Sequence, residues 1–289
     1  MRQQHVNREH LQQITSLKTI ECHSELASTM DRARALATDP SIQLPALVIA
    51  SYQRNGRGRR GAGWWQPSGS LAMTFVMKIP TEEEIAGGIL PVWSLACGLA
   101  VVESLQELNP DLKSLVRWPN DIEIKGRKLA GLLVEATTTQ KLLIGIGINT
   151  DGSKDDAPQA LRDRLITIPD VLGTSISHND LLGILIPRIE KNICDAASLS
   201  TCQSILERYK AHCSLNGTSI KLFDVLCIDI KNESENQVAH QKTTLVGFCK
   251  GIDEVGRLLI ETPHETLAVL AGSLTDPLSI WRSDDSTPR

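Results

Sequence analysis

The sequence predicts an α+β protein, with a central mixed/antiparallel sheet, flanking helices and a small all-β domain at its C-terminal end. Two apolar runs of strand length, at 46–51 and 70–77, enclose an arginine-rich loop, and a meander of short strands fills 115–148. Amphipathic helical patterns lie around these strands, and beyond residue 215 only short strands follow. We therefore expect two domains, residues 1–215 and residues 216–289.

Helices are predicted where apolar residues recur every three or four positions. Leu11, Ile14 and Leu17 have this spacing in the leading helix. Ser28 is expected to be the N-cap of the next helix, and Asn109-Pro110 ends the third. The predicted helices span 6–20, 28–36, 90–108, 180–198 and 202–212.

Strands are predicted where short apolar runs are bounded by turn residues. In the run 142–148 the leucine and isoleucines share one face, whereas Gly145 and Gly147 lie on the other and leave room for a ligand or a neighbouring backbone. The remaining predicted strands of the meander are 115–118, 122–124 and 128–136, and those of the small domain lie near 219–230, 243–250, 257–261 and 266–270. The polar stretch 231–241 is expected to be a long hairpin loop.

Composition and charge exclude several classes of protein. Hydrophobic content of 41% and charged content of 22% over 289 residues are ordinary for a globular protein. A net charge of −4 argues against a protein whose main task is to grip a nucleic-acid backbone. Seven cysteines without a C-x-x-C pair fit neither a zinc site nor a disulfide framework. Without a signal peptide or an apolar membrane span, we expect a cytoplasmic protein that does not attach to membranes.

The loop at 56–61 (GRGRRG) places three arginines among three glycines, and Trp64 and Trp65 follow in a chain with only ten aromatic residues. Glycines let backbone N–H groups approach an anion, and arginines donate to carboxylates or phosphates in a forked geometry. A solvated basic turn is the simpler interpretation of such a short motif. Its position between two core strands favours a binding site for a nucleotide or an acyl phosphate.

Three further segments join this loop: 117–121 (RWPND), 126–135 (GRKLAGLLVE) and 145–149 (GIGIN). In this order the motifs resemble the biotin protein ligases, which attach biotin to carboxylase carrier domains, and the resemblance extends from Ser28 to about Leu274. It implies a catalytic domain like that of class II aminoacyl-tRNA synthetases and of biotin/lipoate ligases, followed by an SH3-like β-barrel. Only 27 residues precede Ser28, which favours the monofunctional form without a DNA-binding domain.

The resemblance also implies roles for individual residues. Lys128 is implied as the main catalytic residue, with Arg59 and Asp121 beside it. Met30 stands where the family usually has asparagine, so one polar contact to biotin is expected to be absent or replaced. The implied biotin-binding residues are Ser28, Thr29, Gln53, Gly56, Arg57, Gly58, Arg59, Lys128, Gly131 and Gly147, and the implied nucleotide-binding residues are Arg59, Trp64, Asn120, Lys128 and Asn149.

As a biotin-[acetyl-CoA-carboxylase] ligase, the protein is expected to form biotinyl-5′-AMP from biotin and ATP. Mg2+ would arrive on the ATP phosphates, with Asp121 as a candidate ligand. The biotinyl group would then pass to a lysine of a biotin carboxyl carrier protein, the ligase being a monomer or weak homodimer that binds no DNA. Two alternatives stay open: a lipoate-protein ligase with the same chemistry, and a nucleic-acid-binding module that stacks bases on Trp64 and Trp65.

Overall fold

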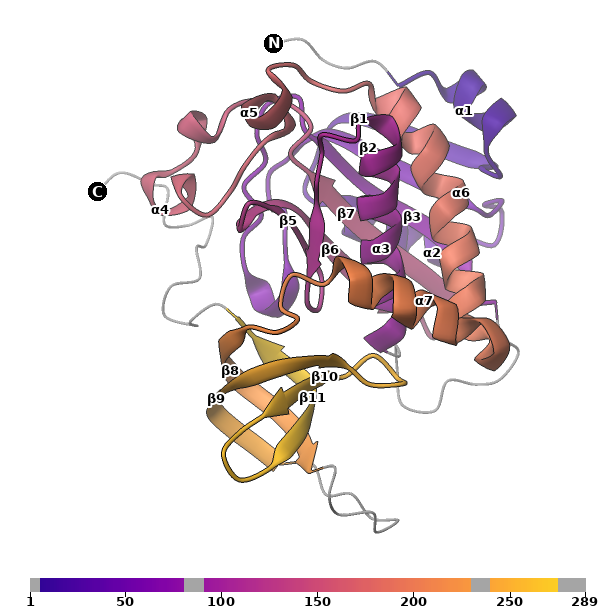
Figure 1. Ribbon diagram of the computed structural model, residues 1–289. Helices are drawn as coiled ribbons and strands as arrows, with labels where there is room; N and C mark the ends of the chain where they lie inside the picture. Colours follow the sequence, from indigo (N-terminus) through magenta and orange to yellow (C-terminus); the bar gives the residue numbers. More distant parts are fainter. Residues whose placement is uncertain (1–5, 81–90, 230–239, 275–289) are drawn as a thin grey trace.

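The computed structural model describes residues 6–80, 91–229 and 240–274, which form a seven-stranded sheet and a closed four-stranded barrel (Figure 1). The sheet order is β1-β2-β3-β7-β6-β5-β4, and β1 pairs with β2 in parallel whereas the other neighbours are antiparallel. The sheet strands are β1 (Thr19–Leu26), β2 (Ala46–Gln53), β3 (Leu71–Lys78), β4 (Leu115–Arg117), β5 (Asp121–Ile124), β6 (Arg127–Ala136) and β7 (Lys141–Ile148). The predicted α+β class with a mixed central sheet is confirmed.

The barrel contains the strands that the sequence predicts after residue 215. They are β8 (Ser219–Asp229), β9 (His240–Ile252), β10 (Leu258–Glu261) and β11 (Thr266–Ser273), closed in the order β10-β11-β8-β9. Most of the predicted hairpin loop at 231–241 lies outside the described residues, and β9 already begins at His240. The division of the chain into domains at residue 215 stays a prediction.

Helices cover both faces of the sheet. The α-helices are α1 (Arg8–Ile14), α2 (Thr29–Thr38), α3 (Pro91–Leu108), α4 (Gln159–Arg162), α5 (Ile168–Leu172), α6 (His178–Ala197) and α7 (Leu199–His212), and the short 3₁₀ helices are η1 (Arg59–Gly61) and η2 (Lys154–Asp156). One core cluster joins α2 to the sheet through Met30, Ala33 and Leu36, and a larger cluster joins α3 and α6 to the opposite face. In the described part of the chain, no helix is both long and apolar enough to cross a bilayer.

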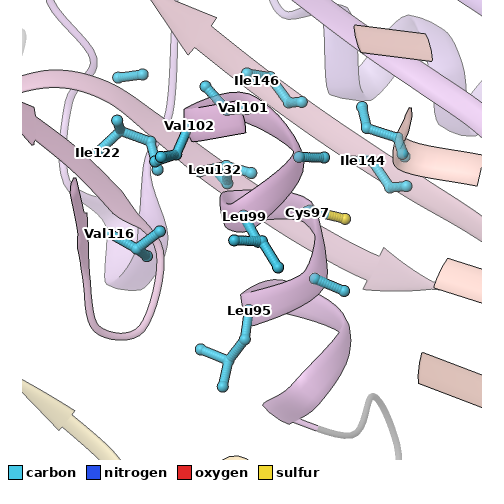
Figure 2. Packing of buried hydrophobic residues seen from close by; sticks show 14 of the residues in the cluster. Leu95, Cys97, Leu99, Val101, Val102, Val116, Ile122, Leu132, Ile144 and Ile146 are labelled. Atoms are coloured by element: carbon cyan, nitrogen blue, oxygen red, sulfur yellow. The ribbon is translucent and has the colours of Figure 1, made fainter. Parts of the chain in front are cut away.

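The helix α3 lies at the centre of the larger cluster. Leu95, Leu99 and Val102 are fully buried on this helix, and Val102 lies near Ile122 and Leu99 near Leu132 of the sheet (Figure 2). The sequence predicts an amphipathic helix here, but Cys97, Ala100 and Val101 are buried as well, because α6 and α7 pack against its other side. A helix that is apolar all round is expected where neighbours cover every side.

The N-terminal prediction is partly wrong. The leading helix ends at Ile14, and the chain continues as the edge strand β1, which the sequence pattern does not indicate. Of the residues in β1 only Ile20 is buried, so the strand lacks the clear apolar alternation of a half-buried strand. Leu17, expected on the helix, lies buried in the connection between the two elements.

Candidate active site

A cavity of about 630 Å³ opens between the arginine-rich loop, the sheet and the barrel. It brings together side chains that are more than 100 residues apart in the sequence, from Ser28 to Asn149. The sequence-predicted residues that line it are Ser28, Thr29, Gln53, Arg57, Gly58, Arg59, Trp64, Asn120, Asp121, Lys128, Gly131, Gly147 and Asn149. Gly56 is the exception, because it is buried behind Trp64, where a Cβ atom would lie 3.2 Å from the Trp64 carbonyl oxygen.

The start of α2 forms one wall of the cavity. Ser28 occupies the N-cap position, as predicted, but its side chain makes no capping hydrogen bond. Instead, Oε1 of Gln53 on β2 accepts from the Thr29 backbone N–H at 2.8 Å and from the Thr29 hydroxyl at 3.1 Å. Because both bonds go to the amide oxygen, the NH₂ group of Gln53 is the part that can donate to a ligand.

Lys128 faces the cavity because of an irregularity in its strand. Ile122 of β5 pairs with Ala130 of β6, but the next residue, Glu123, pairs with Lys128, so β6 contains one extra residue, Leu129. Side chains in a regular strand alternate between faces, which would put Lys128 and Gly131 on opposite sides. A bulge changes this alternation, and both residues line the cavity.

Neighbouring backbone fixes the position of Lys128. Its N–H donates to the Arg164 carbonyl at 2.8 Å, and its carbonyl accepts from the Ile166 N–H at 3.0 Å. The segment that follows α4 therefore pairs with β6 at this residue, and Arg164 and Leu165 also line the cavity. No sequence pattern indicates these two residues, because they lie in an irregular segment between two short helices.

Two cationic side chains bind neighbouring residues of the cavity wall: Lys128 pairs with Asp121, and Arg59 contacts Asn120. The Lys128 ammonium lies 2.7 Å from Oδ1 of Asp121 and 5.7 Å from the centre of the Trp64 ring. Arg59 donates to Oδ1 of Asn120 at 3.2 Å. Asn120 is itself held by hydrogen bonds in both directions with the Leu132 backbone, at 2.8 and 2.9 Å. The arrangement gives the cavity a rigidly supported positive end.

The guanidinium of Arg59 is the most enclosed charge of the loop. Burial lowers the pKa of Arg59, the neighbouring charge of Arg60 lowers it further, and Asp121 raises it. A guanidinium stays charged at neutral pH even so. The lowered pKa therefore marks a buried positive charge that its protein neighbours compensate only in part, a property expected of a group that binds an anion.

Trp64 covers the glycine face of β7. A Cβ atom at Gly147 would lie 2.5 Å from the indole ring, so only glycine permits this close approach. The indole N–H of Trp64 and Oδ1 of Asn149 are buried and have no hydrogen-bond partner among the described residues. Buried polar atoms are rarely left unpaired. One donor and one acceptor are thus available for a planar polar ligand.

The side of the cavity formed by α2 contains Met30, and a Cβ atom added to Gly145 would lie 2.7 Å from its sulfur. The predicted open glycine face of β7 is thus filled by Met30 at one glycine and by Trp64 at the other. The sequence does not indicate a role for Thr74 on β3. This buried residue donates a hydrogen bond to the Thr29 hydroxyl at 2.9 Å. Strand alternation places Thr74 on a buried face but gives no indication of this partner.

A resident metal site does not fit this set of side chains. Within the described ranges, no group of three or more His, Cys, Asp or Glu side chains gathers as metal ligands do. The Asp121 carboxylate, the predicted candidate, is paired with Lys128.

Comparison with known proteins gives this site a family context. Residues 26–151 match the sequence profile of the biotin/lipoate A/B protein ligase family. The chain is 27% identical over 248 residues to the bifunctional ligase/repressor BirA of Bacillus subtilis, covering 83% of this chain and 68% of that protein. It is 31% identical over 161 residues to the biotin--[acetyl-CoA-carboxylase] ligase of Paracoccus denitrificans, covering 54% and 65%, respectively.

The solved structures agree in fold. The biotin protein ligase from Aquifex aeolicus in complex with biotin and ATP superposes with a TM-score of 0.67 at 24% identity, covering 90% of this chain and 97% of that one. Its likeness extends over the sheet and the barrel together, since only a small part of either chain is left out. The match to the biotin/lipoate A/B protein ligase profile thus covers residues 26–151, and the likeness to the solved structure is one of fold.

Proposed function

We propose that the chain is an ATP-dependent biotin protein ligase, which activates biotin as biotinyl-5′-AMP and transfers it to a lysine of a biotin carboxyl carrier protein. One observation carries the proposal: Lys128 and Arg59 converge on adjacent residues of one cavity, beside an aromatic ring with an unpaired N–H. Relatives named as biotin--[acetyl-CoA-carboxylase] ligases, from Paracoccus denitrificans and Mycobacterium tuberculosis, support biotin rather than lipoate as the acyl group.

In the first step, a carboxylate oxygen of biotin attacks the α-phosphorus of ATP. The new P–O bond forms as the bond to the β-phosphate oxygen breaks, and pyrophosphate leaves. Two anions must approach each other, so fixed cations at the α-phosphate supply most of the catalysis. We assign that role to Lys128 and Arg59, with Asp121 holding the ammonium in place before the substrates bind.

In the second step, the neutral amine of the acceptor lysine attacks the carbonyl carbon of the mixed anhydride. The new C–N bond forms, the C–O bond to AMP breaks, and the amine loses a proton to solvent. The same cations stabilise AMP as a leaving group. Magnesium enters as part of the ATP substrate, where it neutralises phosphate charge, and no residue is assigned as its ligand.

The binding roles follow the two ends of the cavity. The Thr29–Gln53 pair and Met30 line the end proposed for the biotin ring system, where the Gln53 NH₂ group can donate. Trp64, Asn149 and Asn120 line the end proposed for the nucleotide. The indole N–H and the Asn149 oxygen match the mixed donors and acceptors of a purine edge.

Two parallel measurements test the proposal against its alternatives. Biotin-dependent exchange of labelled pyrophosphate into ATP measures the first step alone, and we expect exchange with biotin and none with lipoate. Binding of single-stranded DNA, measured in parallel, tests the nucleic-acid alternative. Exchange with lipoate but not biotin would reassign the acyl substrate, and tight DNA binding without either exchange would reject the ligase.

A further inference from the structure

The C-terminal barrel contacts the arginine-rich loop directly. The Arg60 guanidinium donates to the backbone carbonyl of Asp224 on β8 at 3.0 Å, and its other terminal nitrogen lies 3.5 Å from the Asp224 carboxylate. The loop itself is a small hairpin in which Arg57 bridges Gly63. Its other outer arginine, Arg57, is paired with Asp31 of α2, so the hairpin is held from two sides.

The backbone at both partners is unusual. Among the described residues, the non-glycine residues with positive φ are Arg60, Lys125, Gln140 and Asp224. Lys125 and Gln140 lie in hairpin turns between sheet strands, where positive φ is common. The other two, at φ +56 and φ +48, are the residues that contact each other. Such conformations persist only where surrounding contacts stabilise them.

An irregularity of the barrel presents Asp224 to the loop. Ala271 of β11 pairs with Leu226 of β8, and Ser273 pairs with Phe223, so two steps on β11 correspond to three on β8. This extra residue is a β-bulge, a feature that redirects a side chain away from the regular strand. Phe223 and Ser273, on either side of the irregularity, line the cavity. The bulge thus lies at the cavity mouth.

We propose that Asp224 is a positioning residue, which holds the hairpin loop 56–63 closed over the cavity by binding Arg60. The inference rests on the proposed function, because a closed loop would retain biotinyl-5′-AMP until the acceptor lysine arrives. Arg60 and Asp224 are 36% and 51% exposed, so the pair adds little to global stability. The same small free energy is sufficient to shift the balance between open and closed loop several-fold.

Asparagine variants test this contact without disturbing the backbone, because asparagine tolerates positive φ. Asp224→Asn removes the ion pair but keeps the carbonyl acceptor, whereas Arg60→Asn removes both bonds. The matched control is Glu261→Gln, which breaks an exposed barrel ion pair with Lys250, 3.7 Å long, that does not touch the loop.

Hydrogen exchange at the loop amides of Gly58, Ala62 and Trp64, which bond within the hairpin, reports its opening. We expect exchange to be about threefold faster in Asp224→Asn, because this variant loses a partly exposed ion pair. Exchange should be about tenfold faster in Arg60→Asn, because this variant loses the ion pair and a hydrogen bond together. The double variant should match Arg60→Asn, because without the guanidinium the carboxylate has nothing to hold.

The rate at which labelled biotinyl-5′-AMP is released should rise by the same factors. Pyrophosphate exchange in Asp224→Asn should stay within about twofold of the unaltered protein, because Asp224 contributes no charge to the reacting atoms. Loop exchange equal to that of Glu261→Gln in both single variants would overturn the inference, as would additive effects in the double variant. If the unaltered protein shows no biotin-dependent exchange, the proposed function fails, and hydrogen exchange alone still decides whether Asp224 holds the loop.

Discussion

Lys128 shows how one inserted residue can determine the use of a side chain. Leu129 adds a position to β6, and the ammonium then reaches Asp121 and the Trp64 ring within the cavity. Its side chain is 39% exposed, so the ion pair with Asp121 contributes little to stability. In the proposed reaction, this position directs the charge toward an incoming anion.

Replacement of Lys128 by alanine should slow adenylation by roughly a hundredfold or more, because it removes one fixed cation from the α-phosphate. The measurement is biotin-dependent pyrophosphate exchange, with the unfolding midpoint as a check that the fold is retained. Near-normal exchange in Lys128→Ala would refute the catalytic assignment.

His178 offers a test of a buried residue away from the chemistry. Its Nε2 atom lies 2.7 Å from the Thr150 hydroxyl, and burial lowers the His178 pKa to about 4, with Asp151 raising it slightly. In the unfolded chain the His178 ring binds a proton near pH 6.5, whereas in the folded chain it stays neutral until the pH falls to about 4. The resulting stability is present above pH 6.5 and is lost as the pH falls toward 4.

We expect the free energy of unfolding to fall by about 2 kcal/mol between pH 7 and pH 4.5 through this residue. Denaturant titrations at several pH values would measure it, with His178→Gln as the comparison that lacks the titrating ring. Glu21, whose pKa is lowered to about 2 by Arg32, loses its contribution only below pH 4.5. The assignment would be contradicted if the free energy of unfolding changed with pH in the same way in the unaltered protein and in His178→Gln.

At the scale of elements, the arginine-rich loop distributes its three arginines in three directions. Arg57 binds α2, Arg59 reaches Asn120 inside the cavity, and Arg60 binds the barrel. Arg57 and Arg60 are exposed, whereas Arg59 is partly buried, and burial lowers its pKa. The two outer arginines therefore anchor the hairpin, while the middle one is available for the ligand.

Arg59→Gly should weaken retention of the adenylate and raise biotinylation of bystander proteins several-fold, since the loop loses its contact with the opposite wall. Labelling of an unrelated lysine-rich protein, compared with labelling of the carrier, measures this selectivity. Arg54→Gly is a matched control, because Arg54 lies just before the loop, 64% exposed, and pairs with Glu25. Equal selectivity in both variants would count against the loop as a lid.

The sequence could predict most elements but not their irregularities. Apolar runs bounded by turns predict β2, β3 and β7 to within about two residues, because local patterning determines a buried strand. The edge strand β1 has one buried residue and no such pattern. The bulge at Leu129 and the capping of α2 by Gln53 depend on pairing between distant segments, and no local rule indicates them.

The candidate site was more predictable than the fold around it, because motifs carry chemistry at fixed spacing. Of the 14 site residues that the family resemblance implies, 13 line the cavity, and Gly56 is buried behind Trp64 instead. The additional lining residues Arg164, Phe223 and Ser273 come from irregular or C-terminal segments. Their contribution follows from tertiary packing alone.

At the scale of the whole molecule, the barrel packs on the sheet domain at a turn before β10. A Cβ atom on Gly256 would lie 2.9 Å from a methyl group of Leu95 and 3.1 Å from the Val92 nitrogen, both on α3. The Trp118 indole also donates to the Gly256 carbonyl at 3.4 Å. Close backbone contact, rather than a charged interface, joins the two parts here.

Gly256→Ala should therefore lower the free energy of unfolding by about 3 kcal/mol, from positive φ together with overpacking. Gly217→Ala is the matched control, because Gly217 has a similar positive φ of +70 but no atom within 4 Å of an added Cβ. That variant should lose only about 1 kcal/mol. Equal losses in denaturant unfolding would show that the contact with α3 contributes nothing.

The cavity wall runs from Ser28 near one end of the chain to Ser273 near the other. During translation, Ser28 emerges from the ribosome long before Ser273. At about 5–20 residues per second, roughly ten to fifty seconds separate them. A nascent chain therefore cannot assemble the complete pocket during that interval, and the barrel strands β8 and β11 must emerge before the cavity gains its last wall.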